Sequence, residues 1–333
     1  MKVAYLFGGS GYIARFLIKR LLELNRYDKY YILDIKKPLG FDSEINKEKI
    51  VYIELDVRKP IDLPNENIDS DNSWIFNLAA IHREPGHQPQ EYFDTNINGA
   101  NNINDFAQRL GINNIYFTSS IAPYGKSLEQ RSEISPLYPE TPYGISKSMA
   151  ELIHKNWLSN DINNRKRLII VRPSVIYGPN DPGNIYRMVR ALKKGMFILP
   201  NNGNVMKAYG YIYGLIDSAL FTMDKEDKFI LYNYAENPIV NLKEMTKIIK
   251  KKFNYKKPTY SIPLKILIII AFLAQFIFKL LGKKSDIHPV RVKKAGFPTN
   301  IRPEYLINSS FNFKYDFEKS LDHWQKVSPS DFK

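Results

Sequence analysis

The chain has 333 residues, of which 44% are apolar and 25% are charged. These values are ordinary for a folded domain and exclude a disordered or fibrous chain. The chain has no cysteine, which excludes disulfides, thiolate metal sites and cysteine nucleophiles, and we expect no metal. Its formal net charge of +14 suits anionic lipid or a diphosphate group as well as plain solvated lysines, and we do not expect nucleic acid as a partner.

Short apolar runs rich in β-branched and aromatic residues alternate with helical patterns through the first half of the chain. The first run lacks the basic and apolar regions of a secretion signal, so we expect a cytoplasmic protein. Strands are predicted at Val3–Phe7, Tyr30–Asp34, Val51–Leu55, Trp74–Leu78, Ile115–Thr118 and Leu168–Val171. Helices are predicted over Ile13–Leu24, Tyr92–Leu110 and Tyr143–Ser159. This alternation predicts an α/β fold with a Rossmann, doubly wound parallel sheet and helices on both faces.

The alternation breaks after Pro173 into loops, a helix near Ile185–Gly195 and a strand at Phe229–Tyr234. We expect that strand to return to the main sheet. The sequence thus predicts a Rossmann domain over residues 1–174 and a smaller C-terminal α/β substrate-binding lobe over residues 175–333.

A glycine-rich turn, Gly8–Ala14, joins the first strand to the first helix. Small residues there allow a tight turn and let a pyrophosphate approach the helix N-terminus. Asp34 follows at the end of the second strand, where its carboxylate can accept hydrogen bonds from an adenosine ribose. Asp34 would repel a 2′-phosphate, so NAD is favoured over NADP, although Lys36 and Lys37 work against that preference. The residues expected on the cofactor here are Gly8, Gly11, Tyr12, Ile13 and Asp34.

Asp56 and Val57 follow the third strand and are further candidates for the cofactor site. The Asp56 carboxylate is placed to accept a hydrogen bond from the adenine edge. An ordinary turn carboxylate at a strand end explains Asp56 equally well, so both interpretations stay open.

Tyr143 and Lys147 lie four residues apart, with Thr141 as a predicted N-cap and Pro142 at the first helical position. The spacing puts both side chains on one helix face. An ammonium beside a phenol favours the phenolate. We therefore expect Tyr143 to act as a base closer to neutral pH than its reference pKa of about 10 allows.

The segment Thr118–Gly125 ends the fifth strand, at the edge where doubly wound sheets bind ligands. Ser120 is the hydroxyl that we expect to hydrogen-bond the reacting oxygen. Its neighbour Ser119 is a second substrate-binding candidate, unless it only satisfies backbone groups. The predicted catalytic set is therefore Ser120, Tyr143 and Lys147.

The order of these motifs resembles that of the extended short-chain dehydrogenase/reductase family, which includes NAD-dependent epimerases and dehydratases. The resemblance lies in Gly8–Ala14, Asp34, Asn77–Ala80, Asn96, Thr118–Ser120, the Tyr143/Lys147 pair and Arg172-Pro173. The chain is most similar to the bacterial 4-epimerases that act on N-acetylglucosamine linked through diphosphate to undecaprenol, in O-antigen and capsule assembly. That closer similarity lies in Ala79–Arg83, Arg172–Phe197, Tyr232–Tyr234 and Val290–Lys294.

The resemblance implies an enzyme that holds NAD and epimerises carbon 4 of a diphosphate-linked sugar by removing and returning a hydride. It implies that Asn96 steadies a helix near the site and that His82 and Arg83 face the substrate. The residues implied at the border of the cofactor are Leu78, Ala79, Ala80, Tyr143, Lys147, Pro173 and Val175. A diphosphate needs cationic anchors, and the candidates in the second lobe are Arg187, Lys207, Arg291 and Arg302.

Two segments depart from the family pattern. Tyr211–Asp217 lacks the paired acids common in enzymes of nucleotide sugars, and Arg172–Ser174 replaces the Phe-Asn pattern of uridine-diphosphate-sugar epimerases. The carrier of the sugar therefore stays open between a nucleotide and a polyprenol. A homodimer stays open as well.

Other functions are compatible with parts of this pattern. A 4,6-dehydratase needs an acid–base pair beside the catalytic hydroxyl, where Ile121 and Ala122 cannot transfer protons. A net oxidoreductase that acts on a keto-sugar or another alcohol uses the same three catalytic residues and stays the alternative. A scaffold without turnover is disfavoured by the intact catalytic set.

We expect the apolar stretch Ile262–Leu281 to form an amphipathic helix that attaches the protein to an anionic membrane surface, on the inner face of the cytoplasmic membrane. Its apolar part, Ile266–Phe278, is about 20 Å long as a helix, too short to span a hydrocarbon layer of about 30 Å. A core helix of the second lobe is the alternative, because buried helices have the same periodicity. The predicted polar stripe consists of Lys265, Gln275, Lys279 and Lys283.

Overall fold

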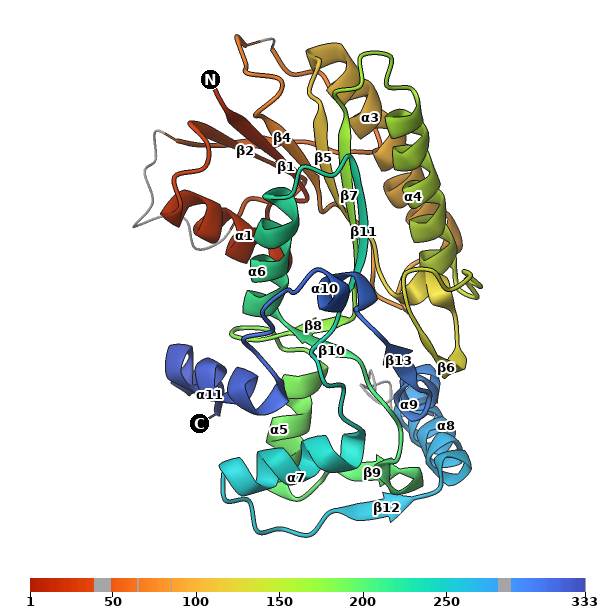
Figure 1. Cartoon of the computed structure of the whole chain (residues 1–333). Helices are drawn as coiled ribbons and strands as arrows, with labels where there is room; N and C mark the ends of the chain where they lie inside the picture. The colour runs from red at the N-terminus through yellow and green to blue at the C-terminus, as the bar shows by residue number, and fades with distance from the viewer. Residues whose placement is uncertain (39–48, 65, 85, 281–288, 333) are drawn as a thin grey trace.

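A seven-stranded parallel sheet is the largest element of the computed structural model (Figure 1). The structure describes residues 1–38, 49–64, 66–84, 86–280 and 289–332, without the side chains of Lys279, Arg291 and Lys294. The strand order is β11-β7-β5-β4-β1-β2-β3, and every neighbouring pair is parallel. The strands are β1 (Val3–Phe7), β2 (Lys29–Asp34), β3 (Ile50–Glu54), β4 (Trp74–Asn77), β5 (Asn114–Thr118), β7 (Arg167–Pro173) and β11 (Phe229–Tyr234). The predicted doubly wound fold is confirmed, and so is the return of β11 to the main sheet.

Helices cover both faces of this sheet, as Figure 1 shows. One face is covered by α1 (Tyr12–Glu23) and α6 (Ile212–Met223), the other by α3 (Gly99–Leu110) and α4 (Pro142–Ser159). The helix predicted over Tyr92–Leu110 is a continuous helical stretch of α2 (Pro89–Phe93), a π-helical turn (Asp94–Asn98) and α3. The predicted start of α4 is confirmed, because Pro142 is its first residue and the Thr141 hydroxyl accepts a hydrogen bond from the Gly144 N–H.

The carboxyl ends of the central strands lie level with one another. Phe7 at the end of β1 is paired with Asn77 of β4, and Thr118 at the end of β5 is paired with Val171 of β7. The strand order reverses between β1 and β4. Doubly wound sheets bind ligands outside the carboxyl ends of the strands at such a reversal, so the fold itself predicts a ligand site at this edge.

Most of the chain after β7 builds a smaller lobe at the carboxyl edge (Figure 1). It contains three small parallel pairs: β8 (Val175–Tyr177) with β10 (Tyr209–Tyr211), β9 (Ile198–Pro200) with β12 (Tyr260–Ile262), and β13 (Thr299–Ile301) with β6 (Ser127–Arg131). Its helices are α5 (Asn184–Lys194), α7 (Leu242–Lys252), α8 (Leu264–Leu280), α9 (Pro289–Gly296), α10 (Glu304–Asn308) and α11 (Phe317–Val327). The domain boundary at residue 174 stays a prediction.

The sequence patterns predict α5, α8 and β11 in this half of the chain but miss the other elements. α6 has nine buried positions among its twelve residues, so it carries no single apolar stripe. The strands of the three small pairs have three to five residues, too few for a clear alternation. These elements are specified by their tertiary neighbours and not by local periodicity.

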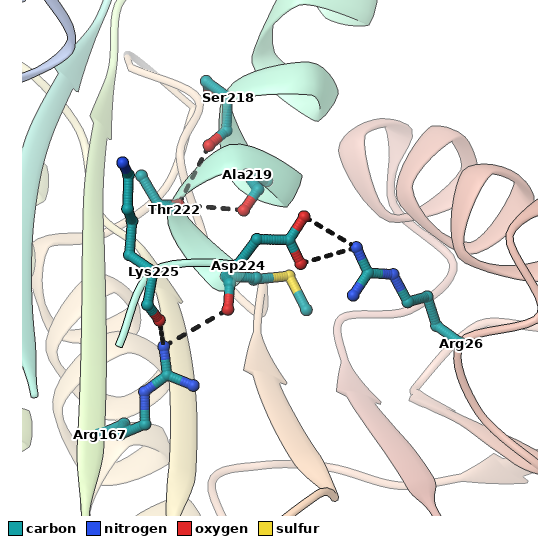
Figure 2. Close-up of polar contacts among 8 residues, drawn as sticks. Arg26, Arg167, Ser218, Ala219, Thr222, Asp224 and Lys225 are labelled. Atoms are coloured by element: carbon teal, nitrogen blue, oxygen red, sulfur yellow. Dashed lines mark hydrogen bonds and ion pairs between the residues drawn. The ribbon is translucent and has the colours of Figure 1, made fainter. Parts of the chain in front are cut away.

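Two arginines tie the end of α6 to the first half of the chain (Figure 2). The Arg26 guanidinium donates to both carboxylate oxygens of Asp224, at 2.7 and 2.9 Å. Arg167, at the start of β7, donates to the backbone oxygens of Met223 and Lys225. The Arg167 bonds satisfy carbonyls at the C-terminal end of α6, and the bonds of both arginines hold that end against the first half of the chain.

A buried ion pair joins α4 to β7. The Arg172 guanidinium donates to Glu151 through Nε at 2.9 Å and through a terminal nitrogen at 2.6 Å, and the two side chains are only 3% and 1% exposed. Arg172 also donates to the Tyr124 hydroxyl at 2.8 Å, which in turn donates to Asn233 of β11 at 2.8 Å. One charged network therefore crosses from the helix through two strands.

We predict that Arg172→Met lowers the free energy of unfolding by about 3–5 kcal/mol, because it leaves the Glu151 carboxylate charged and buried without its partner. Asp224→Asn, which breaks the partly exposed Arg26 pair, should cost less than about 1 kcal/mol. Urea titrations of the two variants beside the wild-type protein measure both numbers. Equal losses would mean that the buried pair does not hold α4 on the sheet.

Candidate active site

The glycine turn after β1 lies against the end of β4. Gly8 has a φ of +74°, and a Cβ there would lie 2.5 Å from the backbone nitrogen of Ala79. α1 begins after Gly11, which makes no side-chain cap, and its first turn holds no acidic residue. The free N–H groups and the positive end of the helix dipole suit a pyrophosphate, and a side chain at Gly8 would close the turn. These residues fit the diphosphate of a dinucleotide.

Asp34 lies beside this turn at the end of β2. Its carboxylate accepts hydrogen bonds from the backbone N–H of Ser10 at 3.0 Å and of Lys36 at 3.1 Å. Each carboxylate oxygen has a second lone pair for a ribose hydroxyl. The ribose contact of Asp34 stays a prediction, but the structure brings Asp34 and the glycine turn together as the sequence predicts.

The Asp56 carboxylate is held by Arg58 and not left open for a base. The Arg58 side chain donates to both oxygens of Asp56, at 2.6–2.9 Å, and lowers the pKa of that carboxyl. This favours the turn-carboxylate interpretation of Asp56. Val57 beside it is buried against Gly99 of α3.

The predicted catalytic side chains lie together at the carboxyl edge. Tyr143 is in the first turn of α4, and the Ser120 hydroxyl, from the loop after β5, is close enough to lower the pKa of its phenol. Lys147 lies one turn further along α4, is 1% exposed, and has its Nζ 4.5 Å from the centre of the Phe117 ring. The structure therefore brings Ser120 to Tyr143 and puts Lys147 on the same helix, as predicted.

The electrostatics of this site differ from the prediction. Burial raises the pKa of Tyr143 to about 12, against a lowering by the Ser120 hydrogen bond, and the Glu84 carboxylate raises it further. Burial also lowers the pKa of Lys147 to about 7, although Glu151 opposes this. The expectation that Lys147 acidifies the phenol is not met, because burial has the largest effect on the pKa of Tyr143 and Lys147 is not among the groups that shift it.

The first turn of α4 is positioned by its neighbours. The Asn96 side chain accepts from the Ile81 N–H at 3.0 Å and donates to the Ser146 hydroxyl at 2.8 Å, and Ser146 donates to the Tyr143 carbonyl at 2.9 Å. The Tyr143 N–H donates to the Glu84 carboxylate at 3.3 Å. The steadying role that the resemblance implied for Asn96 is confirmed by these bonds.

Ser119 does not face the substrate side. Its side chain is 2% exposed and its hydroxyl donates to the Glu151 carboxylate at 2.5 Å, inside the buried network. The prediction that Ser119 binds substrate is wrong, because successive side chains at a strand end point to opposite sides. Of the two serines, only Ser120 points to Tyr143.

The predicted substrate-side residues lie on separate elements of the structure. His82 and Arg83 lie in the loop after β4, where desolvation and the Arg83 charge, with a smaller contribution from Lys147, lower the pKa of the His82 imidazole. Arg187 lies in α5 and donates to Asn184 at 3.0 Å. Lys207 is buried, donates to the Phe297 carbonyl, and has its pKa lowered to about 8 by burial. A shared diphosphate site for these cations stays a prediction.

Two further anchor candidates lie on the segment of α9 and β13. Arg291 is in α9, and its side chain lies outside the described residues. Arg302 follows β13, and its backbone N–H donates to the Arg131 carbonyl of β6 at 2.8 Å.

Two acidic residues of the site are not predicted from the sequence. Glu151 lies four residues after Lys147, and this helical spacing is a signal that could have revealed it. Glu84 is in a loop, where no periodicity marks a residue that folds back onto a helix N-terminus.

Comparisons with known proteins agree with this geometry. A family model described as the NAD dependent epimerase/dehydratase family matches residues 4–235. The N-acetyl-alpha-D-glucosaminyl-diphospho-ditrans,octacis-undecaprenol 4-epimerase of Escherichia coli O157:H7 is 28% identical over 246 residues, 74% of each chain. The decarboxylating sterol-4-alpha-carboxylate 3-dehydrogenase of Saccharomyces cerevisiae is 26% identical over 310 residues, 86% of each chain.

A solved structure has the same fold over nearly the whole chain. The UDP-glucuronic acid 4-epimerase of Bacillus cereus, in complex with UDP-glucuronic acid and NAD, superposes with a TM-score of 0.70 at 15% identity and covers 98% of both chains. The matched family segment runs from β1 to the end of β11 and includes the glycine turn, Ser120, Tyr143 and Lys147. The chain therefore belongs to the NAD-dependent epimerase/dehydratase family, as an enzyme of the extended short-chain dehydrogenase/reductase type whose cofactor is NAD.

Proposed function

We propose that this enzyme is a 4-epimerase of a diphosphate-linked sugar. The observation that carries the proposal is the proximity of the Ser120 and Tyr143 hydroxyls, with the buried Lys147 one turn away, at the same sheet edge as the glycine turn. This set removes a proton from an alcohol beside a hydride acceptor. The Escherichia coli relative is named as a 4-epimerase, which supports this reaction over a net oxidation.

In the proposed reaction, the Tyr143 oxygen takes the proton of the sugar 4-hydroxyl and Ser120 holds the same sugar oxygen by a hydrogen bond. Bound NAD supplies a hydride acceptor and a positively charged ring. A positive charge near Tyr143 favours its phenolate, so we expect the pKa of Tyr143 to fall from its resting value when the site is filled. Lys147 would donate hydrogen bonds to the ribose hydroxyls of NAD and stabilise the negative charge of the Tyr143 phenolate. Loss of this proton and of the hydride on carbon 4 would leave a 4-keto sugar. That sugar would turn in the site while its diphosphate stays bound. The hydride would then return to the opposite face of carbon 4 and Tyr143 would return the proton to the oxygen, so the reaction has no net redox change.

The finer part of the proposal concerns the carrier. We propose that the sugar is N-acetylglucosamine or a similar hexosamine on a polyprenyl diphosphate, used in bacterial surface polysaccharide assembly such as O-antigen. The undecaprenyl-linked substrate in the name of the Escherichia coli relative supports this, as does the lack of paired acids in Tyr211–Asp217. Arg187, Lys207 and Arg291 are the proposed cations for the diphosphate.

We also propose that the protein is cytoplasmic and works at the inner face of the membrane, where such carriers expose their sugars.

We further propose that the protein forms a homodimer through α4. The side chains of α4 that support this are three large apolar ones, 38–58% exposed at helical spacing, namely Ile145, Met149 and Leu152. An apolar stripe on an exposed helix face suits an interface between two copies.

An assay without added NAD tests the proposed reaction. A purified epimerase regenerates its cofactor in every cycle and should turn over many times, whereas a net oxidoreductase would stop after one equivalent. Lipid-diphosphate and nucleotide-linked N-acetylglucosamine are compared side by side. We expect the lipid-linked sugar to react faster, and a strong preference for the nucleotide would overturn the carrier assignment while leaving the 4-epimerase.

We predict that Tyr143→Phe lowers the turnover by about 10²–10⁴-fold, because only the oxygen that accepts the proton is removed. NAD binding and the fold should stay close to those of the wild type, as measured by NAD fluorescence quenching and circular dichroism. Retention of more than a tenth of the wild-type rate would contradict the role of Tyr143 as base.

Asp34→Ala should weaken the preference for NAD over NADP by about tenfold, which corresponds to the loss of about 1.4 kcal/mol of repulsion. Asp56→Ala is the matched control, since it removes a carboxylate of the same edge that Arg58 already holds. The ratio of the two Kd values is measured for each variant. A wild-type protein that binds NADP more tightly than NAD would refute the assignment of Asp34.

A further inference from the structure

The outer face of α8 is apolar and open to solvent. Its large side chains there are 47–71% exposed, namely Ile266, Ile269, Ile270, Phe272, Leu273, Phe276, Ile277 and Leu280. At about 100° per residue these positions cover an arc of about 160° around the helix. A surface helix of a soluble domain normally turns its apolar side inward, so this face is arranged for contact with another apolar phase.

The inner face of α8 packs against the rest of the protein. Ala271 is buried, Gln275 is half-buried, and Leu264 packs against Gly296 of α9. The predicted polar stripe is therefore wrong in part, because Gln275 turns toward the protein and Lys265 lies within the exposed apolar arc. The side chain of Lys279 and the whole of Lys283 lie outside the described residues. The core-helix alternative also fails, since only the inner side of α8 is buried.

The surroundings of this face are cationic and aromatic. Lys265 is exposed in the first turn of the helix, and Lys293 is exposed on α9. Tyr260, directly before the helix, is 63% exposed. Lysines and aromatic rings at the border of an apolar helix face are typical of contacts with lipid headgroups.

We propose that the outer face of α8 docks on the surface of an anionic lipid bilayer, with the helix lying parallel to the membrane plane. The apolar arc enters the boundary of headgroups and acyl chains, and the lysines contact the anionic headgroups. No helix among the described residues is long and apolar enough to cross a membrane. A second copy of this chain is a worse occupant, because two such faces would bring lysine against lysine on a chain of net charge +14.

This docking surface rests on the proposed work at the membrane and deepens it, because it names the helix that makes the contact; it would serve an enzyme of either carrier. It is nevertheless connected along the chain to a segment near the candidate active site. α9 follows α8 and leads through Phe297, which accepts from Lys207, into β13, and β13 pairs with β6 just after the Ser120 loop (Figure 1). A membrane that contacts α8 would therefore lie beside the segment that borders the active site.

Co-sedimentation with vesicles tests the surface. The wild-type holoenzyme is mixed with phosphatidylglycerol vesicles and with phosphatidylcholine vesicles at about 0.1 M salt. We expect it to bind the anionic vesicles at least tenfold better. Ile269→Glu/Phe276→Glu should lower that binding by at least tenfold, and Ile269→Ser/Phe276→Ser should lower it without a change of charge.

The matched control is Ile134→Glu/Ile162→Glu, which adds the same charge at two apolar side chains that are 90% and 97% exposed elsewhere. It should bind like the wild type. All replaced side chains are exposed, so circular dichroism and the Tm should be unchanged in each variant. Turnover measured in detergent should also be unchanged, so a failure of the docking surface is distinguishable from a failure of the proposed reaction.

A tryptophan at the outer face gives a second readout. Phe272→Trp should show a blue-shifted emission with phosphatidylglycerol vesicles and quenching by brominated lipid, because the ring leaves water. A wild-type protein that stays in the supernatant with anionic vesicles would overturn the proposal. Binding that survives both double substitutions in α8 would also overturn it. So would a dimer that depends on Ile269 and Phe276 in a protein that does not bind vesicles.

Discussion

The buried ion pair of Glu151 and Arg172 is the constraint on which the active site depends. Both charges are removed from water, and such a pair is tolerable only when its geometry is good and its remaining lone pairs are satisfied. Here the Ser119 and Tyr124 hydroxyls complete the network. Because Glu151 lies on the helix that carries Tyr143 and Lys147, the network fixes how that helix meets the ends of β5 and β7. The positions of the proposed catalytic residues on α4 therefore depend on a contact in the core.

The main sheet could be predicted from the sequence because its strands are buried on both faces. Such strands read as continuous apolar runs, for example Val3–Phe7, and their periodicity contrasts with the helices between them. The smaller lobe could not be predicted in the same way. Its strands pair across long stretches of chain, as β13 does with β6, and their residues are chosen by neighbours that no local pattern reveals. α6 is a similar case, because burial on nearly all sides removes the stripe by which a helix is found.

The candidate site also has one part that could be predicted from the sequence and one part that could not. Residue types at fixed spacing, such as Tyr143 with Lys147 or the glycine turn with Asp34, are visible in the sequence because chemistry requires them there. The direction in which a side chain points cannot be predicted from the sequence in this way. Ser119 and Ser120 are the same residue type in adjacent positions, and only the pleat decides that one hydroxyl faces the core and the other faces Tyr143. The pKa values follow burial, which also depends on the finished fold.

Burial gives this site a defined resting state. With a Tyr143 pKa of about 12 and a Lys147 pKa of about 7, the phenol is protonated near neutral pH and the amine carries only part of its charge. The same low dielectric that causes these pKa shifts also strengthens the interaction of Tyr143 and Lys147 with any charge placed beside them. A positive charge near Tyr143 would therefore shift its equilibrium toward the phenolate more strongly here than at a solvated site. The catalytic base is thus expected to form together with the filled site, so that proton and hydride are taken from the sugar in the same arrangement.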